Sequence, residues 1–321
     1  MPPPHHPDRT PLEAVPRATH RKAAAGRGGR AGRGGHGSTG FLRRRLLGGL
    51  GCCGPDQRRR NVRPGPLALG GLVLALGSCV SLERPQLRVL TYNIHHGRGT
   101  DGQVDLERIA KVILSTHPDL VALQEVDHRT GRTNNADQAQ ILALLTDMEA
   151  HFGRAIDFDG GEYGEAVLLG LKSGTPRTHP LPASPGHEQR AALAVPVWLP
   201  SGEEVLFVGT HLDHTKDPAD RLAQSIALKA SFSDQTAVVL VGDLNAEVGS
   251  PPVERLLKVF DRAGGRQPLP TFPSDKPTKS IDHVLFRLPG WSVKSIRIVD
   301  APDASDHAPL LVVFERRAPL R

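Results

Sequence analysis

The chain has 321 residues, with 40 Lys and Arg against 34 Asp and Glu, a formal net charge of +6 and a pI near 9.5. Its three cysteines are Cys52, Cys53 and Cys79, which excludes a disulfide framework and a cysteine-ligated zinc site for the rest of the chain. No run of about 18 apolar residues occurs, which argues against a membrane-spanning helix.

The basic charge is confined to residues 1–64. This segment holds 13 Arg and one Lys against three acidic residues, a net charge of +11, and leaves −5 on residues 65–321. Because it also contains 12 Gly and few apolar residues, it cannot bury enough surface to offset its chain entropy, and we predict that it is disordered. An RNA-binding Arg/Gly tail is the alternative, but Phe41 is the only aromatic residue there that could stack on a base.

Residues 65–79 have the layout of an export signal. Arg58-Arg59-Arg60 and Arg63 precede a short apolar stretch that ends in Leu76-Gly77-Ser78-Cys79. This ending resembles a bacterial lipobox, in which the cysteine is acylated and becomes the mature N-terminus. We therefore predict lipidation of Cys79 and an exported, membrane-anchored protein of the bacterial cell envelope. A buried apolar helix with an incidental cysteine, in a cytoplasmic protein, is the alternative.

The position of this signal bears on where translation starts. Signal peptides carry their positive charge at the N-terminus, whereas this one lies far inside the chain. We infer a start at Val62 through a non-AUG codon, which would leave residues 1–61 untranslated. N-terminal sequencing of native protein that finds residues before Val62 would contradict this inference.

From Leu87 onward, short β-rich runs alternate with segments of helical periodicity. The expected strands are Leu87–Tyr92, Leu120–Leu123, Ala166–Leu171, Ala192–Leu199, Val205–Gly209, Ala237–Val241, Ile281–Phe286, Val293–Val299 and Leu310–Phe314. The expected helices are Leu106–Thr116, Ala136–Met148, Pro218–Ser231 and Pro251–Leu257. No linker-like stretch divides residues 86–316, so we expect a single α/β domain of sheets flanked by helices.

Polar residues repeatedly stand where these strands begin or end. They are Asn93, Glu125, His211, Asp243, Asn245, Asp282, Asp306 and His307. Side chains at the strand ends of one sandwich edge can converge on a single pocket. Carboxylates, amides and imidazoles without cysteine suit a hard cation such as Mg²⁺ and a phosphate substrate.

Six motifs carry these residues and cover about residues 87–315. They are Thr91-Tyr92-Asn93-Ile94, Leu123-Gln124-Glu125-Val126, Gly209-Thr210-His211-Leu212-Asp213, Gly242-Asp243-Leu244-Asn245, Ser280-Ile281-Asp282-His283 and Ser305-Asp306-His307. Together they resemble the endonuclease/exonuclease/phosphatase superfamily, and the segment after Leu90 is similar to that of its bacterial metal-dependent hydrolases. The resemblance implies an α/β fold, a four-layer αββα sandwich of two mixed sheets flanked by helices, as the catalytic domain of residues 86–316.

The resemblance also implies roles for the metal and water sites. Phosphoester hydrolysis needs a metal to neutralise non-bridging oxygens, an oriented water, and donors for the transition-state charge. Glu125 is the expected ligand of Mg²⁺ or Mn²⁺, with Asn93 and Asp306 completing the site directly or through water. Asp243 is expected to orient or deprotonate the water, and Asn245 to hold the water or the phosphate.

The two motif histidines are expected to face the phosphate. His211 should donate to it, and His307 should lie against it with its tautomer fixed and its pKa raised by Asp282. Whether Asp243 or His307 is the base is left open by the sequence.

Three residues are tentative substrate contacts. Glu165 stands where the family often has Asn, and it could repel a phosphate or add a ligand. His96 follows the Asn93 motif, with a plain loop role as the alternative. Arg190 precedes a strand and could reach a phosphate, with a surface ion pair as the alternative.

Three further departures from the family pattern concern substrate contacts more than the reaction. Leu169-Gly170 replaces the usual Ser-Arg, Ser280 replaces an Arg, and His283 replaces a Tyr.

The most specific hypothesis is that the protein is a monomeric Mg²⁺-dependent phosphoesterase anchored through Cys79. Its expected substrate is a phosphodiester or phosphomonoester of a lipid or small molecule. A DNA endonuclease is the alternative enzyme, disfavoured because the charge of −5 on residues 65–321 offers no basic face for a duplex backbone. An anchored binding protein without catalysis is the alternative of another class, and the complete set of eight polar residues argues against it.

Overall fold

The computed structural model describes residues 84–318. The tail of residues 1–64, the signal of residues 65–79 with Cys79, and the start at Val62 therefore lie outside the described residues. Within residues 84–318, no helix is both long and apolar enough to cross a membrane.

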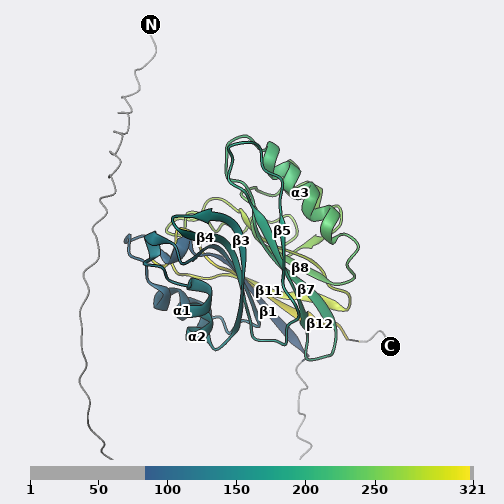
Figure 1. Ribbon diagram of the computed structural model, residues 1–321. Coiled ribbons are helices and arrows are strands. Elements are labelled where there is room, and N and C mark those ends of the chain that lie inside the picture. The colour runs from purple at the N-terminus through teal and green to yellow at the C-terminus, as the bar shows by residue number, and fades with distance from the viewer. Residues whose placement is uncertain (1–83, 319–321) are drawn as a thin grey trace, which may run out of the picture. The chain divides into compact units, whose positions relative to one another are not determined.

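Two six-stranded mixed sheets form the centre of the fold (Figure 1). The first has the order β11 (Trp291–Ile298), β12 (Leu310–Arg316), β1 (Gln86–Asn93), β2 (Leu120–His128), β4 (Gly161–Leu169), β3 (Glu149–Phe158). The second has the order β5 (Arg177–Pro180), β6 (Ala191–Trp198), β7 (Glu204–His211), β8 (Val238–Asp243), β10 (Asp282–Arg287), β9 (Asp261–Arg262). Each sheet contains one parallel pair, β1 with β2 and β7 with β8, and the other neighbours are antiparallel.

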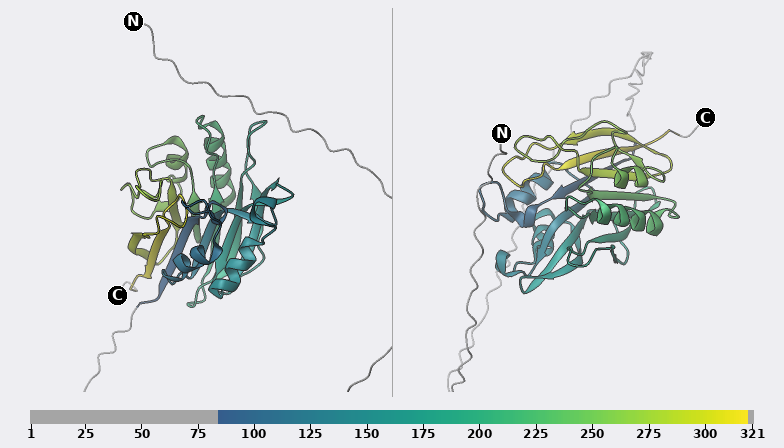
Figure 2. Two further views of the ribbon diagram at one scale, coloured as in Figure 1. Left: turned by 90° about the vertical axis from the view of Figure 1, so that its left-hand side faces the viewer. Right: turned by 90° about the horizontal axis from the view of Figure 1, so that it is seen from above.

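Helices cover the outer face of each sheet (Figures 1 and 2). The bounds are α1 (Leu106–Leu114), α2 (Gln138–Thr146), α3 (Ala219–Phe232) and α4 (Pro251–Leu256), with short 3₁₀ turns η1 (His95–Gly97) and η2 (Gly131–Thr133). Asp105 caps α1 by accepting from the backbone of Arg108, and Asp137 caps α2 by accepting from Gln140.

Three apolar layers separate these elements. Alternate residues of β1 point to opposite faces, so Val89 packs between the sheets against Phe207, whereas Leu90 packs under α1 against Ile109. A third cluster joins the second sheet to α3 and α4, with Leu228 among its buried side chains. The order helix, sheet, sheet, helix confirms the predicted four-layer αββα sandwich.

The nine predicted strands and four predicted helices are all present, with ends that differ by a few residues. Three strands were missed, namely β3, β5 and β9. All three are edge strands, at one end of the first sheet and both ends of the second. An edge strand has one unpaired side in water, so it tolerates polar residues and short lengths and shows a weak alternating pattern.

His283 of β10 joins the edge strand β9 to the loop after β8. Its Nδ1 accepts from Arg262 Nε at 2.8 Å, and its Nε2 donates to the carbonyl oxygen of Ala246 at 2.8 Å. The side chain is buried, and burial together with the Arg262 charge lowers the pKa of His283 to about 4. His283 is therefore neutral in the folded protein at pH values where it would be protonated in the unfolded chain.

This difference predicts an acid-dependent loss of stability. A histidine whose pKa is lower in the folded protein than in the unfolded chain stabilises the fold above pH about 6.5. This contribution to the free energy of unfolding is about 3 kcal/mol, and it is lost as the pH falls toward about 4. His283→Gln keeps an acceptor for Arg262 and a donor for Ala246 but cannot titrate. Denaturant unfolding gives the free energy of unfolding at each pH from 7 to 4. The slope of this free energy against pH should be smaller in His283→Gln than in wild type, by the equivalent of about one proton. The exposed His117→Gln is the control, and equal slopes for His283→Gln and wild type would contradict the prediction.

Candidate functional site

The strand ends of both sheets meet at one edge of the sandwich. Asn93 ends β1, His211 ends β7, Asp243 ends β8, and Asp282 begins β10 directly opposite Asp243 in the antiparallel register. Side chains at this edge line a hollow of about 370 Å³. They are Glu125, Tyr163, Glu188, Arg190, His211, His214, Asp243, Asn245, Phe272, Asp306 and His307.

A bulge in β2 aims Glu125 into this hollow. The register with β4 shifts between Leu123 and Val126, and Glu125 has a left-handed φ of 59°. Such a bulge turns one side chain away from the regular alternation of the strand. The half-buried carboxylate is held by Asn93, whose Nδ2 donates to Glu125 Oε1 at 3.0 Å.

The Gly242-Asp243-Leu244-Asn245 turn needs its residue types. A Cβ on Gly242 would lie 1.8 Å from the carbonyl oxygen of Thr210, so only glycine allows this close approach of β8 to β7. Asn245 has a left-handed φ of 46°, which Asn tolerates better than most residues. Its backbone N–H donates to Asp243 Oδ1 at 2.8 Å, which fixes that carboxylate.

A buried row of charges runs from Asp282 through His307 to Asp243. His307 Nδ1 lies 2.9 Å from Asp282 Oδ2, and His307 Nε2 lies 3.6 Å from Asp243 Oδ2. Thr271 Oγ1 donates to Asp282 Oδ2 at 2.5 Å, and Phe272 packs on the His307 ring with centroids 4.8 Å apart. Asp282 therefore accepts from the Nδ1–H of His307 and fixes the orientation of the ring.

The row separates the pKa values of its members. Burial opposes protonation of His307, but the charges of Asp282 and Asp243 outweigh it and raise the pKa of His307 to about 10. Burial, then the charge of Asp282, raises the pKa of Asp243 to about 7. Burial works against the charge of Asp282, yet its bonds to His307 and Thr271 keep its pKa below the usual value. Near neutral pH, His307 is a cation and Asp243 can accept a proton.

Arg190 holds His211 in one tautomer. Its guanidinium is buried, and Nη1 lies 2.8 Å from His211 Nδ1 while Nη2 lies 3.1 Å from His214 Nδ1. Because arginine only donates, His211 Nδ1 must accept, which places the ring proton on Nε2, 3.0 Å from the side-chain amide of Asn245 and 3.4 Å from Asp243 Oδ2. Burial and the Arg190 charge lower the pKa of His211 well below its usual value, so the ring is a neutral donor.

The proposed metal ligands lie on the solvent side of this row. Glu125 and Asp306 both line the hollow, and the Asp306 side chain is 41% exposed. Asn93 uses its Nδ2 on Glu125 and on Asp243, at 3.0 and 3.3 Å, while its Oδ1 accepts from the His95 backbone. The two accessible carboxylates supply the oxygen donors that Mg²⁺ prefers, and Asn93 orients one of them.

The three tentative contacts have different surroundings. Arg190 is not a surface ion pair, since it is 2% exposed and lies behind the histidines, although it also lies 3.3 Å from Glu188. Glu165 is buried and lies outside the lining of the hollow, and burial raises its pKa well above the usual value, which disfavours its charged form. His96 is buried beside Glu125 and also lies outside the lining.

Two residues of the site were not anticipated from the sequence. Thr271 and Phe272 lie in the loop between β9 and β10, where they contact Asp282 and His307. Neither residue type marks a catalytic motif, and no strand end precedes them that could have drawn attention to the loop.

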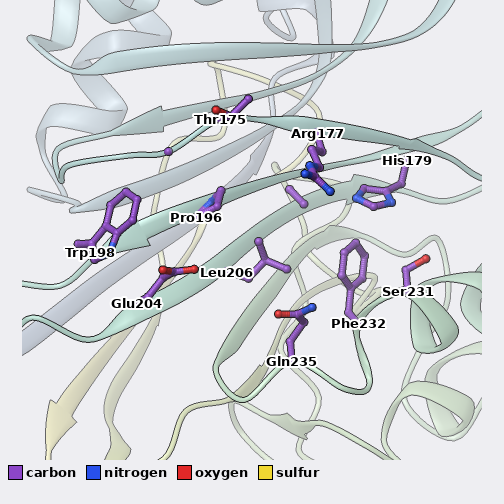
Figure 3. Close-up of a pocket in the computed structure, with 12 residues that line it drawn as sticks. Thr175, Arg177, His179, Pro196, Trp198, Glu204, Leu206, Ser231, Phe232 and Gln235 are labelled. Atoms are coloured by element: carbon purple, nitrogen blue, oxygen red, sulfur yellow. The ribbon is translucent and has the colours of Figure 1, made fainter.

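A larger hollow, of about 500 Å³, lies on the second sheet away from this edge (Figure 3). Its side chains include Trp198, Leu206 and Phe232, with Arg177 and Glu204 as its charged members. None of the eight motif residues lines it. We therefore do not place the catalytic site in the larger hollow, because the reactive groups converge in the smaller one.

Fold and site together define a class, an α/β-sandwich hydrolase acting on phosphoester bonds. Residues 90–307 match the profile described as the Endonuclease/Exonuclease/phosphatase family, and the chain belongs to this family. Comparison with curated protein sequences gives no match.

Solved structures of the same fold come from distant organisms. An endonuclease/exonuclease/phosphatase from Beutenbergia cavernae is 26% identical, with a TM-score of 0.63 over 73% of this chain and 72% of that one. A Bacteroides thetaiotaomicron mannosyl-6-phosphatase is 19% identical, with a TM-score of 0.57 over 71% and 99% of the two chains. D. rerio TDP2, solved with a single-strand DNA product, is 16% identical, with a TM-score of 0.56 over 72% and 99%.

The role of Arg190 can be tested without an activity assay. Arg190→Met keeps much of the volume but removes both donors and the charge, so the pKa of His211 should rise and its proton should no longer be confined to Nε2. Imidazole ¹⁵N–¹H spectra recorded across pH report both changes. The exposed Arg177→Met is the control, and an unchanged His211 spectrum in Arg190→Met would rule out the assignment.

Proposed function

We propose that the protein is a divalent-metal-dependent phosphoesterase that acts on a phosphate ester of a lipid or small molecule at the cell envelope. The observation that carries the proposal is the Asp282–His307–Asp243 row, which holds a cation and a proton acceptor side by side next to two accessible carboxylates. The envelope location rests on the sequence, through the lipobox-like ending at Cys79.

The groups around the hollow suit attack of water on phosphorus. Asp243, with a pKa of about 7, is suited to take the proton of the attacking water, and we assign it the role of the base. Protonated His307 cannot act as that base, and it stabilises the charge that develops on the phosphoryl oxygens. The Nε2–H of His211 supplies a further donor beside Asp243, and the Asn245 amide, which contacts His211 Nε2 and donates to the Leu212 carbonyl oxygen, holds that ring in place.

A metal at Glu125 and Asp306 would neutralise the non-bridging oxygens of the phosphate. Asn93 would keep the Glu125 carboxylate pointing at that position. The water attacks as the ester oxygen leaves, and the proton removed from the water resides on Asp243.

A DNA endonuclease is the second candidate, favoured by the likeness to a relative solved with single-strand DNA. Against it stands the net charge of −5 on residues 65–321, because duplex-tracking nucleases neutralise backbone phosphates with basic residues.

A substrate panel separates these functions. Plasmid DNA, abasic DNA, sphingomyelin, phosphatidylinositol and nitrophenyl phosphates are each assayed with Mg²⁺, with Mn²⁺ and with a chelator. We expect metal-dependent turnover of a lipid or small phosphoester, reduced by about 10²–10⁴ in kcat in Asp243→Asn and by about 10²–10³ in His307→Gln. Glu125→Gln should abolish metal-dependent turnover.

The exposed Glu107→Gln is the matched control for Glu125→Gln and should retain full activity. Plasmid nicking lost in the same three variants would promote the nuclease. Absence of turnover on every substrate would favour the binding protein.

The charge row also predicts a pH profile. At fixed metal concentration, kcat/KM should rise as Asp243 deprotonates near pH 7 and fall as His307 deprotonates toward pH 10, with a bound cation moving both limbs to lower pH. In Asp282→Asn the charge that raises both pKa values is lost, so both limbs should shift to lower pH. An alkaline limb that stays in place in this variant would show that His307 does not produce it.

A further inference from the structure

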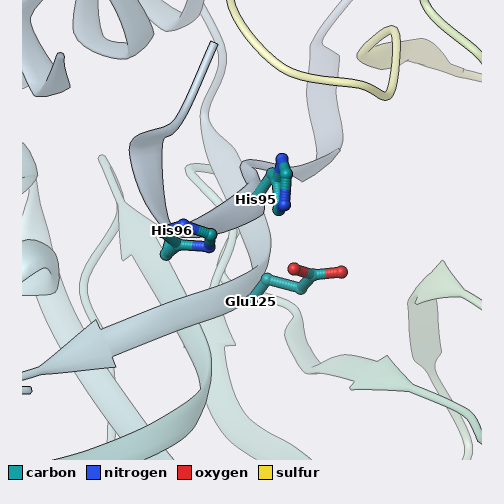
Figure 4. Close-up of side chains that lie close together, drawn as sticks. All are labelled: His95, His96 and Glu125. Atoms are coloured by element: carbon teal, nitrogen blue, oxygen red, sulfur yellow. The ribbon is translucent and has the colours of Figure 1, made fainter. Parts of the chain in front are cut away.

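A second group of potential ligands lies beside the row described above. His95, His96 and Glu125 each offer one ligand atom, and the three atoms lie within 4.8 Å of one another. Figure 4 shows the two rings in the turn after β1 and the carboxylate on β2 facing a common space. Hydrolysis as derived above uses only Glu125 of this group.

All three residues have left-handed backbone conformations. Their φ angles are 46° for His95, 45° for His96 and 59° for Glu125, in a region that is unfavourable for a non-glycine residue. The fold holds the turn in place, since Gln138 Nε2 donates to the His96 carbonyl oxygen at 2.7 Å. The three left-handed residues bring side chains together that regular strands would point apart.

The His96 ring has one nitrogen without a partner among residues 84–318. The His96 side chain is buried, with 8% exposed, and its Nδ1 makes no hydrogen bond within the described residues. A buried polar atom without a partner is unfavourable, because its hydrogen bond to water has been lost and not replaced. The edge-to-face contact with the His95 ring, with centroids 4.6 Å apart, does not replace it.

The surrounding charges permit a cation. Arg132 lies near His96, but it is paired with the buried Asp127 through two contacts of 2.7 Å, and Arg98 is exposed to water. His95 is 31% exposed, which leaves a path for an ion and an open position for water.

We propose that His95, His96 and Glu125 bind a transition-metal dication, with Zn²⁺ as the ion of choice. Two imidazoles and one carboxylate form a donor set found in zinc sites, whereas Mg²⁺ prefers oxygens. Asp306 Oδ1 lies 3.8 Å from His95 Nδ1, so this site adjoins the oxygen-rich site and shares Glu125 with it. Two adjacent cations would act on the attacking and leaving oxygens of one phosphate, while binding of zinc itself does not depend on the hydrolysis proposed above.

The test compares zinc stoichiometry in the full chain. Cys52, Cys53 and Cys79 are replaced by Ser in every sample so that thiols do not compete. Equilibrium dialysis with Zn²⁺ in excess Mg²⁺ should find one more tightly bound ion in this parent than in His95→Asn/His96→Asn, whose asparagines tolerate left-handed φ. Loss of a residue that only orients a metal ligand lowers metal affinity by about 10–100-fold. Loss of the two ligands themselves should lower the affinity for that zinc ion by more than this.

Cobalt gives a second readout. Co²⁺ bound in the same position should show visible d–d absorption that disappears in the double variant and in Glu125→Gln. His117→Asn, a histidine with the same left-handed φ of 45° outside the group, should bind and absorb like the parent. If the double variant unfolds by circular dichroism, His95→Asn alone, at a partly exposed position, replaces it.

Equal zinc stoichiometry and unchanged cobalt spectra in parent and variants would overturn the site. Histidine-dependent zinc binding without turnover of any phosphoester would uphold the site and reject the proposed function. Mg²⁺-dependent turnover with no histidine-dependent zinc binding would do the reverse.

Discussion

The site depends on one imidazolium held between two buried carboxylates. Asp282 and His307 alone would form a neutral pair, which a protein interior accepts when the geometry and the remaining hydrogen bonds are good. The additional carboxylate of Asp243 is the strained member, because burial and the nearby Asp282 charge both disfavour its ionised form. The same contacts that make Asp243 costly to ionise make it able to accept a proton near neutral pH, so the chemistry is a consequence of the burial.

The sandwich supplies this burial through two parallel strand pairs. β1 with β2 and β7 with β8 deliver their last residues to the same edge, and β10 returns with Asp282 opposite Asp243. Irregular backbone finishes the site at the Gly242 approach to Thr210, at the left-handed Asn245 and at the bulge that turns Glu125. The regular parts of the sheets thus fix the distances, and the irregular parts aim the side chains.

Residues in or next to interior strands can be predicted from the sequence, whereas residues in edge strands and loops are harder to predict. Interior strands are apolar and are bounded by motif residues, so β1, β2, β7, β8 and β10 were predicted, as was the αββα order. The edge strands β3, β5 and β9 were missed because they are polar or short, whereas the edge strand β11 was predicted. Side chains at strand ends could be named, because sheet geometry forces them together. The roles of Thr271 and Phe272 could not be predicted, because a contact made from a loop leaves no periodic pattern in the sequence. The burial of Arg190 against His211 could not be predicted either.

The charges around the hollow favour a bound cation there. Glu125 and Asp306 present carboxylates to the space that a phosphate would occupy, and Arg190 offers little in return because it is buried behind the histidines and lies 3.3 Å from Glu188. At about 4 Å and an effective dielectric of about 20, each like-charge contact opposes binding by about 4 kcal/mol. The single cation of His307 offsets only part of that repulsion. Phosphate would therefore be attracted to bound metal rather than to the protein's own charge. The pI near 9.5 is produced by residues 1–64 and does not describe the charge around the hollow, so it says nothing about the substrate.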